Sequence, residues 1–396
     1  MLGFDESLRF AAQRNAALAT ARANVTAAAQ RARAAYGGFY PQVSANVNYS
    51  DSTGRLSPTT TFTGTDYSTN VTVTQNLFAG FQDQARVAQA AANVDIADAA
   101  LVSSKAQLSR DLKVAYAELS YAQDNIVLTE SILRRLEENL RLVELRFESG
   151  RENKGAYLVT RASVAQARFE RLQAQQGLTS AQVQLANLIG QPTTDIEARD
   201  VVPTRLPPPA PDFKAIAAQT PDVRDAVARQ RSADADVQLA RSGFYPSVNV
   251  SATRGREGES WFPDNDRRAV NASIAIPLFS GGRDIYSVRG ALAALDAAKS
   301  NRENVEGLAL VRLQQNYAAY VESVEKLNVD REFLDATETR ANIARARYQN
   351  GLITFDEWDR TENDLIQRQK TFLASQRDRV NAEAAWELAQ GQGVIP

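Results

Sequence analysis

The side chains that most often carry out catalysis and bind metals are missing from this chain. Its 396 residues include no histidine and no cysteine. The chain therefore cannot build a Ser-His-Asp or Cys-His nucleophile, a zinc site of the usual ligands, or a haem or iron–sulfur centre held by its own His or Cys. Neighbouring carboxylates such as Asp234 and Asp236 fall on an expected helix surface, where no pocket is implied. We expect no enzyme activity, no cofactor and no metal site.

Charged side chains gather beside two glycines, Gly150 and Gly351, each of which ends a long helical pattern. The chemistry open to them is ion pairing. Exposed ion pairs each contribute about 0 to 1 kcal/mol, so a set of them could bias a closed arrangement without locking it. A solvated helix face is the ordinary alternative for any one of these charges. The candidates are Glu148, Arg151, Glu152, Arg347, Asp356, Glu357, Asp359 and Arg360.

Composition narrows the class of protein further. Lysine and arginine total 45 against 47 acidic residues, a net charge of −2, which gives no overall positive field for nucleic acid. The mean hydropathy is −0.36. No apolar run reaches the roughly 18 to 20 residues of a membrane-spanning helix. The absence of cysteine fits an oxidising compartment. The first ten residues lack the pattern of an export signal, so we expect any such signal to have been removed.

The chain repeats itself. The repeated motifs are GFYP at 38–41 and 243–246, offset by 205, LF-x-G at 77–80 and 278–281, offset by 201, and R-[FY]-x-x-G at 146–150 and 347–351, also offset by 201. We therefore expect two structural repeats, residues 1–200 and 213–396, joined by a proline-rich linker at 201–212.

Each repeat is expected to hold a helix, a β-hairpin, a very long helix and a return helix. The expected hairpins are 39–79 and 244–280, the long helices 82–149 and 283–350, and the return helices 155–189 and 355–390. Apolar residues spaced by seven, such as Leu112 and Leu119, predict a left-handed coiled coil. A helix of about 68 residues would be roughly 100 Å long. Two shorter helices stacked beside each long one would leave the termini and the linker to form a belt.

The strand segments alternate apolar residues with serine, asparagine and threonine. This period of two predicts a sheet with one apolar and one polar face. The polar face carries almost no charge, which suits a water-filled lumen. Aromatic residues gather at both strand ends, as in the girdles of an outer-membrane barrel, with Tyr49, Phe62, Tyr67, Trp261 and Phe262 at the turn end. The expected lumen residues are Asn46, Asn48, Asn70, Asn249, Ser251 and Asn271.

Four strands cannot close a barrel, and open strand edges in lipid leave backbone groups unpaired. The chain must therefore oligomerise if it spans a membrane. Both ends of each hairpin lead into helices, so all helices would lie on one side, and the turn segments, expected at 51–66 and 255–267, on the other. The alternative is a soluble periplasmic coiled-coil scaffold or adaptor, whose strands would need a charged outer face.

Taken together, the sequence resembles the TolC-like outer-membrane channels, or outer-membrane factors, over essentially its whole length. The resemblance is carried by FYP at 39–41 and 244–246, by LF-x-G at 77–80 and 278–281, and by RY-x-x-G-L at 347–352. The doubled order of these motifs is the specific part. The resemblance implies an α+β membrane protein: a trimeric twelve-stranded β-barrel, four strands per chain, continued by a long α-helical coiled-coil barrel with a belt at mid-height.

The resemblance also implies a function and partners. A homotrimer in the outer membrane of a Gram-negative bacterium, with its helical part in the periplasm, would be the exit duct of a tripartite efflux pump or a type I secretion system. Its partners would be a periplasmic adaptor (membrane fusion protein), an inner-membrane pump of RND or ABC type, and outer-membrane lipid. The duct would open by an iris-like movement of the helix tips, where the eight charged candidates would form the aperture gate. Gly150, Gly351 and Leu352 would dock the adaptor.

Overall fold

The computed structural model describes residues 1–57, 60–191 and 195–395. Of residues 54–57 and 60–63 it describes the backbone but not the side chains. Contacts between Cα atoms divide the chain into two compact units. The helical unit contains Met1–Arg22, Ala100–Val223 and Glu306–Pro396, and the sheet unit contains Ala23–Ala99 and Arg224–Val305. Each unit takes segments from both halves of the sequence. The division into two repeats joined at 201–212 stays a prediction about the sequence.

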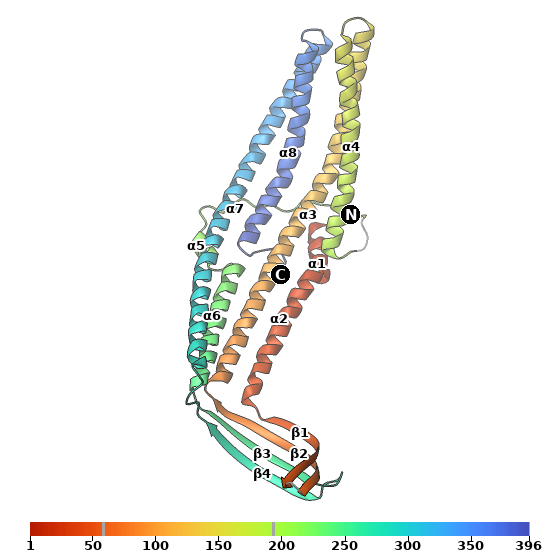
Figure 1. Cartoon of the computed structure of the whole chain (residues 1–396). Helices are drawn as coiled ribbons and strands as arrows, with labels where there is room; N and C mark the ends of the chain where they lie inside the picture. The colour runs from red at the N-terminus through yellow and green to blue at the C-terminus, as the bar shows by residue number, and fades with distance from the viewer. Residues whose placement is uncertain (58–59, 192–194, 396) are drawn as a thin grey trace. The chain divides into compact units, whose positions relative to one another are not determined.

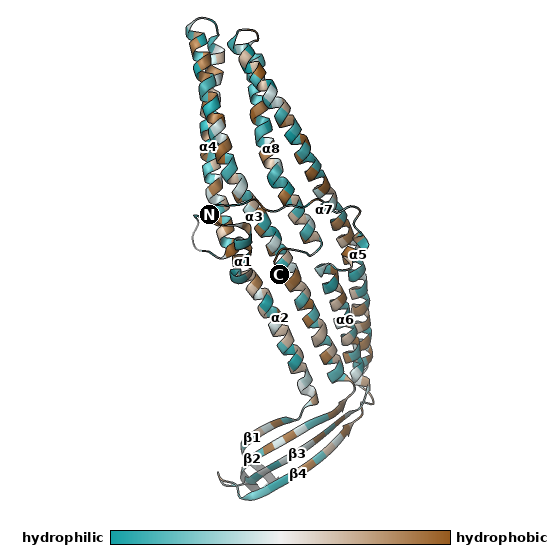
Figure 2. Ribbon diagram, turned by 180° about the vertical axis from the view of Figure 1, so that it is seen from behind, coloured by the Kyte–Doolittle hydropathy of each residue, from teal (hydrophilic) through white to brown (hydrophobic). Residues whose placement is uncertain are grey.

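Four long helices follow the two hairpins in pairs. They are α3 (Gln82–Glu148), α4 (Lys154–Ile189), α7 (Arg283–Gln349) and α8 (Phe355–Ala389) (Figure 1). Hydrophilic and hydrophobic residues are mixed along each of them (Figure 2). Among the residues described, none of the helices is both long enough and apolar enough to span a membrane.

The shorter helices are broken where a single helix is expected in each half. The pieces are α1 (Phe4–Arg14), α2 (Ala16–Ala35), α5 (Phe213–Ala217) and α6 (Pro221–Arg241). Asn15 between the first two has an extended backbone, and its side chain accepts a hydrogen bond from the Leu18 amide at 3.1 Å. Asn15 therefore ends one helix and caps the next. Pro221 begins α6, because proline disfavours a helical residue before it and suits the first helical position.

The core of the helical unit follows the predicted heptad spacing. Leu112, Ala115 and Leu119 of α3 are 0% exposed, and Leu313 and Tyr320 of α7 are 0% and 2% exposed. All five belong to the series spaced by seven, so this part of the predicted seams is buried.

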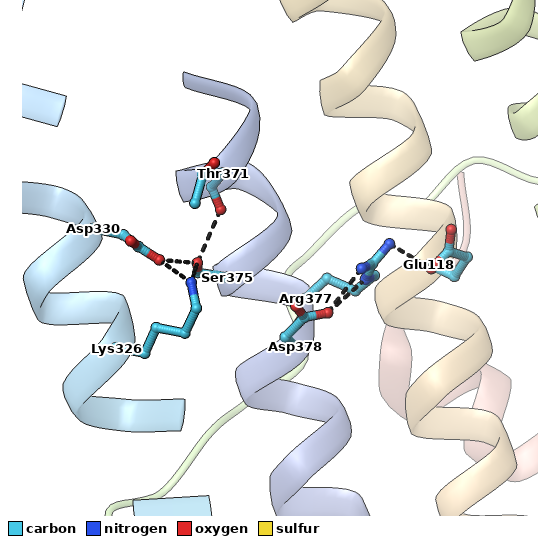
Figure 3. Close-up of polar contacts among 7 residues, drawn as sticks. All are labelled: Glu118, Lys326, Asp330, Thr371, Ser375, Arg377 and Asp378. Atoms are coloured by element: carbon cyan, nitrogen blue, oxygen red, sulfur yellow. Dashed lines mark hydrogen bonds and ion pairs between the residues drawn. The ribbon is translucent and has the colours of Figure 1, made fainter. Parts of the chain in front are cut away.

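Polar contacts hold α8 to its neighbours on both sides (Figure 3). Toward α7, Ser375 accepts a hydrogen bond from Lys326 Nζ at 3.1 Å and also bonds to Asp330. Toward α3, Arg377 lies 3.5 Å from Glu118 while it also binds Asp378 of its own helix. These contacts fix the order α3, α8, α7 within the helical unit.

A buried ion-pair cluster also joins α3 to α8. Lys113 is 3% exposed, and its Nζ lies 2.7 Å from Glu387 and 3.6 Å from Glu383. Glu383 additionally accepts a hydrogen bond from the Arg205 amide at 3.1 Å. The cluster therefore ties the segment after residue 200 to the same pair of helices.

The sheet unit holds one antiparallel sheet in the order β1-β2-β3-β4. The strands are β1 (Gln42–Ser57), β2 (Thr60–Ala79), β3 (Ser247–Gly258) and β4 (Asn265–Ala275). The expected turn segments, 51–66 and 255–267, were too long, because strand pairing continues to Ser57↔Thr60 and to Glu257↔Asn265. Strand pairing needs only main-chain hydrogen bonds, so it continues past the residues whose apolar alternation set the expected ends of the strands. β1 and β4 are the two edges.

Candidate functional site

The two turns between paired helices, which we term the first tip (residues 146–157) and the second tip (347–358), are built alike. Gly150 and Gly351 have φ values of 72° and 73°, in the left-handed region that favours glycine. Beyond them, the Arg151 and Leu352 amides donate back into the preceding helix at 2.8 and 2.9 Å, which completes a Schellman motif. The Asn153 and Thr354 side chains then cap the next helices. The local sequence thus makes each chain reversal sharp.

Tyr348 joins the two tips. It is 1% exposed, and its hydroxyl donates to Glu152 Oε2 of the first tip at 2.8 Å. Arg146 donates to the Tyr348 carbonyl at 2.6 Å and places its guanidinium 4.5 Å from the ring centroid. The ring of Trp358 also stacks on the ring of Tyr348, with ring centroids 4.3 Å apart and an angle of 8° between the ring planes. Burial and the Glu152 carboxylate raise the pKa of Tyr348, so the phenol remains a hydrogen-bond donor.

The repeated motifs at 146–150 and 347–351 include Arg146 and Tyr348, but sequence reasoning assigned no role at the tips to either of them or to Trp358. Roles at the tips were assigned only to charged residues, to the two glycines and to Leu352, so the contact of Tyr348 with Glu152 was not expected. The aromatic residue that the motif repeats three positions before each helix-ending glycine, Phe147 and Tyr348, is the signal from which this role could have been predicted.

The eight expected gate residues lie at or directly behind the tips, but within the described part of the chain no ion pair joins two of them. Glu152 lies against Tyr348, and Asp359 is half-buried and accepts a hydrogen bond from Asn363 at 3.0 Å. The other six side chains are exposed: Glu148, Arg151, Arg347, Asp356, Glu357 and Arg360. A single chain therefore leaves most of these charges available to other chains.

Glu362, a second acidic residue, follows Asp359 by about one helical turn in α8. Glu362 is 2% exposed and binds Arg135 through two hydrogen bonds, at 2.6 and 3.0 Å. Asn139 donates to it at 3.2 Å. Burial, together with the carboxylates of Asp356 and Glu362, raises the pKa of Asp359. Arg135 therefore compensates the charge of Glu362, while the charge of Asp359 is disfavoured.

The expected docking residues are open to solvent. Leu352 is 72% exposed. A Cβ added at Gly150 would meet no atom within 4 Å, and at Gly351 the nearest would be Arg146 Nη2 at 3.9 Å. The second tip thus presents an apolar side chain beside an uncovered backbone.

The sheet register gathers the six expected lumen residues on one face, because directly opposite residues in an antiparallel pair share a face. Asn46 lies opposite Asn70, and Ser251 opposite Asn271. Asn249 lies two residues from Ser251, and Asn48 lies two residues from Asn46, so each points to the same face as that neighbour. The other face exposes apolar side chains over most of its length and charged ones near the turns: Val47, Val270 and Ile274 are 76%, 79% and 69% exposed.

Aromatic clusters lie at both ends of the strands. At the turn end, Tyr67 contacts Tyr49 and Trp261 with ring centroids 5.0 and 5.6 Å apart. At the helix end, Phe81 contacts Phe78 and Tyr245 at 5.2 and 5.4 Å. The side chain of Phe62, expected at the turn end, lies outside the described residues.

Long paired helices, a doubled β-hairpin and a sheet with one polar and one apolar face fit the class of outer-membrane channels. The comparisons with known proteins name the family. The model for "Outer membrane efflux protein" matches residues 8–191 and 214–392, so the chain belongs to the outer membrane efflux protein family.

Two similar proteins are named for the outer membrane or for efflux. The probable outer membrane lipoprotein SilC of Salmonella typhimurium is 25% identical over 69% of this chain and 59% of its own length. The cation efflux system protein CusC of Escherichia coli K12 is 25% identical over 74% and 64%. The chain thus spans about three fifths of the length of these relatives.

Solved structures share the fold. The outer-membrane channel OprN matches with a TM-score of 0.89 at 22% identity, covering 99% of this chain and 91% of that one. VceC of Vibrio cholerae matches with 0.88 at 22%, covering 99% and 97%. The predicted α+β fold, with four strands per chain and long paired helices, and the outer-membrane location are confirmed, and membership of the outer membrane efflux protein family agrees with the expectation that the chain is not an enzyme.

Proposed function

We propose that this chain is one subunit of a homotrimeric exit duct, through which an inner-membrane pump and a periplasmic adaptor pass substrates out of the cell. The observation that carries the proposal is the sheet. Its register puts every expected lumen residue on one face and leaves an apolar face exposed, while both edge strands, β1 and β4, lack an outer partner among the described residues.

Lipid requires every backbone group in it to be paired, so the edges must meet other strands. β4 of one chain pairing with β1 of the next satisfies both edges. Three copies give twelve strands, and the lumen face with its asparagines and serines then lies inside, in water. A soluble scaffold would instead have to cover valines and isoleucines that are more than two thirds exposed, such as Val47 and Ile274.

The direction of the duct follows from the chain order. Both hairpins connect to helices at their open ends, so the helices lie in the periplasm and the turns face the exterior. Relatives named for cation efflux and toluene efflux favour an efflux pump over a type I secretion system as the partner machinery.

The periplasmic aperture lies at the tips. Six exposed charges per chain meet their copies around the threefold axis, and Tyr348 holds the two tips of each chain together through Glu152. Opening is an iris-like outward movement that separates these contacts. Leu352 and the open backbones of Gly150 and Gly351 receive the adaptor.

The proposal is tested by reconstituting purified protein into planar lipid bilayers. We expect detergent-dependent extraction, a particle of three chains, and discrete conductance steps. A monomer that stays dissolved without detergent and gives no conductance would contradict it.

A further inference from the structure

Two arginines lie opposite each other on the apolar face of the sheet, near its turn end. Arg254 of β3 pairs in register with Arg268 of β4. On its other side Arg254 lies opposite Val71 of β2, and Arg268 is two residues from Val270. Both arginines therefore share the face of the exposed valines. Both are exposed.

Neighbouring charges on the same two strands are paired, but these two are not. Arg267 lies 2.8 Å from Glu257 on the lumen face, and Arg256 lies 3.4 Å from Asp266 on the apolar face. In the part of the chain that the structure describes, no carboxylate lies within ion-pair distance of Arg254 or Arg268. Like charges directly opposite destabilise a strand pair, so an anion from outside the chain would stabilise this one.

The surroundings of the pair suit an amphiphile. The two arginines border a hollow of about 730 Å³ with an apolar lining from Val71, Val73 and Val270. Tyr67, opposite Gly258 and so nearer the turn, carries the ring contact with Trp261. Along this face the order is therefore valines, then guanidinium groups, then aromatic rings. Tyrosine and tryptophan prefer the level of lipid headgroups.

Arginine is suited to the anion of such a lipid. Its planar guanidinium binds phosphate through two parallel hydrogen bonds, and two guanidinium groups opposite each other can clasp one phosphate group. Basic pockets on membrane proteins bind phosphorylated lipid headgroups by the same chemistry.

We propose that Arg254 and Arg268 bind the phosphate of a lipid headgroup in the outer leaflet, with an acyl chain of that lipid lying along Val71, Val73 and Val270. This inference rests on the proposed function, because it needs the apolar face in the bilayer and the strand turns on the outer side. The outer leaflet of a Gram-negative outer membrane presents phosphorylated glycolipid at that level.

The test is a lipid titration of the purified protein in detergent, followed by native mass spectrometry. The probes are diphosphorylated lipid A, its dephosphorylated form, and inorganic phosphate. We expect diphosphorylated lipid A to bind the wild type. We expect the double variant Arg254→Gln/Arg268→Gln, which loses both guanidinium groups, to bind it at least about tenfold more weakly, since the loss of even one charge-assisted hydrogen bond has that effect. Arg267→Gln, on the same strand but the opposite face, is the control and should bind as the wild type does.

Equal binding by the double variant would overturn the inference, as would inorganic phosphate displacing the lipid at equal concentration, which indicates a free-anion site. If the double variant is recovered poorly, Arg254→Lys/Arg268→Lys keeps the charges and loses the paired hydrogen bonds, and binding equal to the wild type would count against the arginine clasp. Bilayer conductance is recorded in parallel. Weakened lipid binding by the double variant with unchanged conductance supports the inference. Intact lipid binding when neither the wild type nor any variant conducts contradicts the proposed duct instead.

Discussion

At the scale of single residues, Tyr348 is the contact on which the two tips of one chain depend. Tyr348→Phe removes the hydroxyl that donates to Glu152 and keeps the stacking on Trp358. A hydrogen bond to a charged acceptor contributes about 1.5 to 3 kcal/mol, and a trimer would lose three. We expect single-channel recordings of Tyr348→Phe to show a larger or more frequently open conductance.

The matched control is Tyr157→Phe at the first tip. Tyr157 stacks on Phe147 at 5.6 Å, and its hydroxyl makes no hydrogen bond with any residue the structure describes. This variant should conduct as the wild type does. Identical recordings from both variants would show that Tyr348 does not restrain the aperture.

Asp359 gives a pH-dependent prediction. Its pKa is raised in the folded chain, so its ionisation opposes folding. The penalty is absent below the ordinary carboxyl pKa, grows as the pH rises toward the raised value, and is complete above it. Asp359→Asn, which can still accept from Asn363, should raise the melting temperature at pH 7 and leave it unchanged near pH 3. A gain that is larger in acid would contradict this assignment.

At the scale of elements, Lys113 tests how α3 and α8 are held together. Lys113→Met leaves Glu383 and Glu387 without their cation in a buried site. Breaking a buried ion pair in this way costs about 3 to 5 kcal/mol of unfolding free energy. Guanidinium denaturation followed by tryptophan fluorescence measures the loss. Arg229→Gln, in an exposed pair with Asp225, is the control and should cost less than about 1 kcal/mol.

Gly80 tests the corner between β2 and α3. Its φ is 61°, and an added Cβ would lie 2.7 Å from the Ser242 carbonyl oxygen and 2.8 Å from Tyr245 Cβ. Gly150 has a similar φ of 72° but open space around it. Both Gly→Ala variants pay about 1 to 2 kcal/mol for the left-handed backbone, and only Gly80→Ala adds the overpacking cost of about 1 to 3 kcal/mol. Equal melting temperatures would show that the corner can relax.

Periodicity predicts these elements well because it is a local property of the chain. The heptad series around Leu112 and the alternation around Val47 report which face of an element is buried or apolar, and the structure has both. They do not report which partner covers that face. The contact between Glu152 and Tyr348 joins residues 196 positions apart, so it depends on how two helical hairpins pack. The break at Asn15 was missed because one polar residue hardly disturbs a helical pattern.

At the scale of the whole molecule, the sequence repeat predicts how copies pair. Within one chain, Val73 of β2 lies opposite Ala252 of β3. The offset of 201 carries Val73 onto Ile274 of β4, and the offset of 205 carries Ala252 back onto Val47 of β1. If the edge between copies pairs as the inner strands do, Ile274 of one subunit lies opposite Val47 of the next.

The double variant Val47→Cys/Ile274→Cys measures this directly, because the chain has no cysteine of its own. β1 and β4 are separated by three strand spacings, roughly 14 Å, whereas a disulfide needs Cα atoms within about 7 Å, so the bond can form only between subunits. After mild oxidation in the membrane, we predict a reducible covalent band of three chains on a denaturing gel, absent from either single variant. A band of one chain only, or a ladder that extends beyond three chains, would contradict a closed trimeric duct.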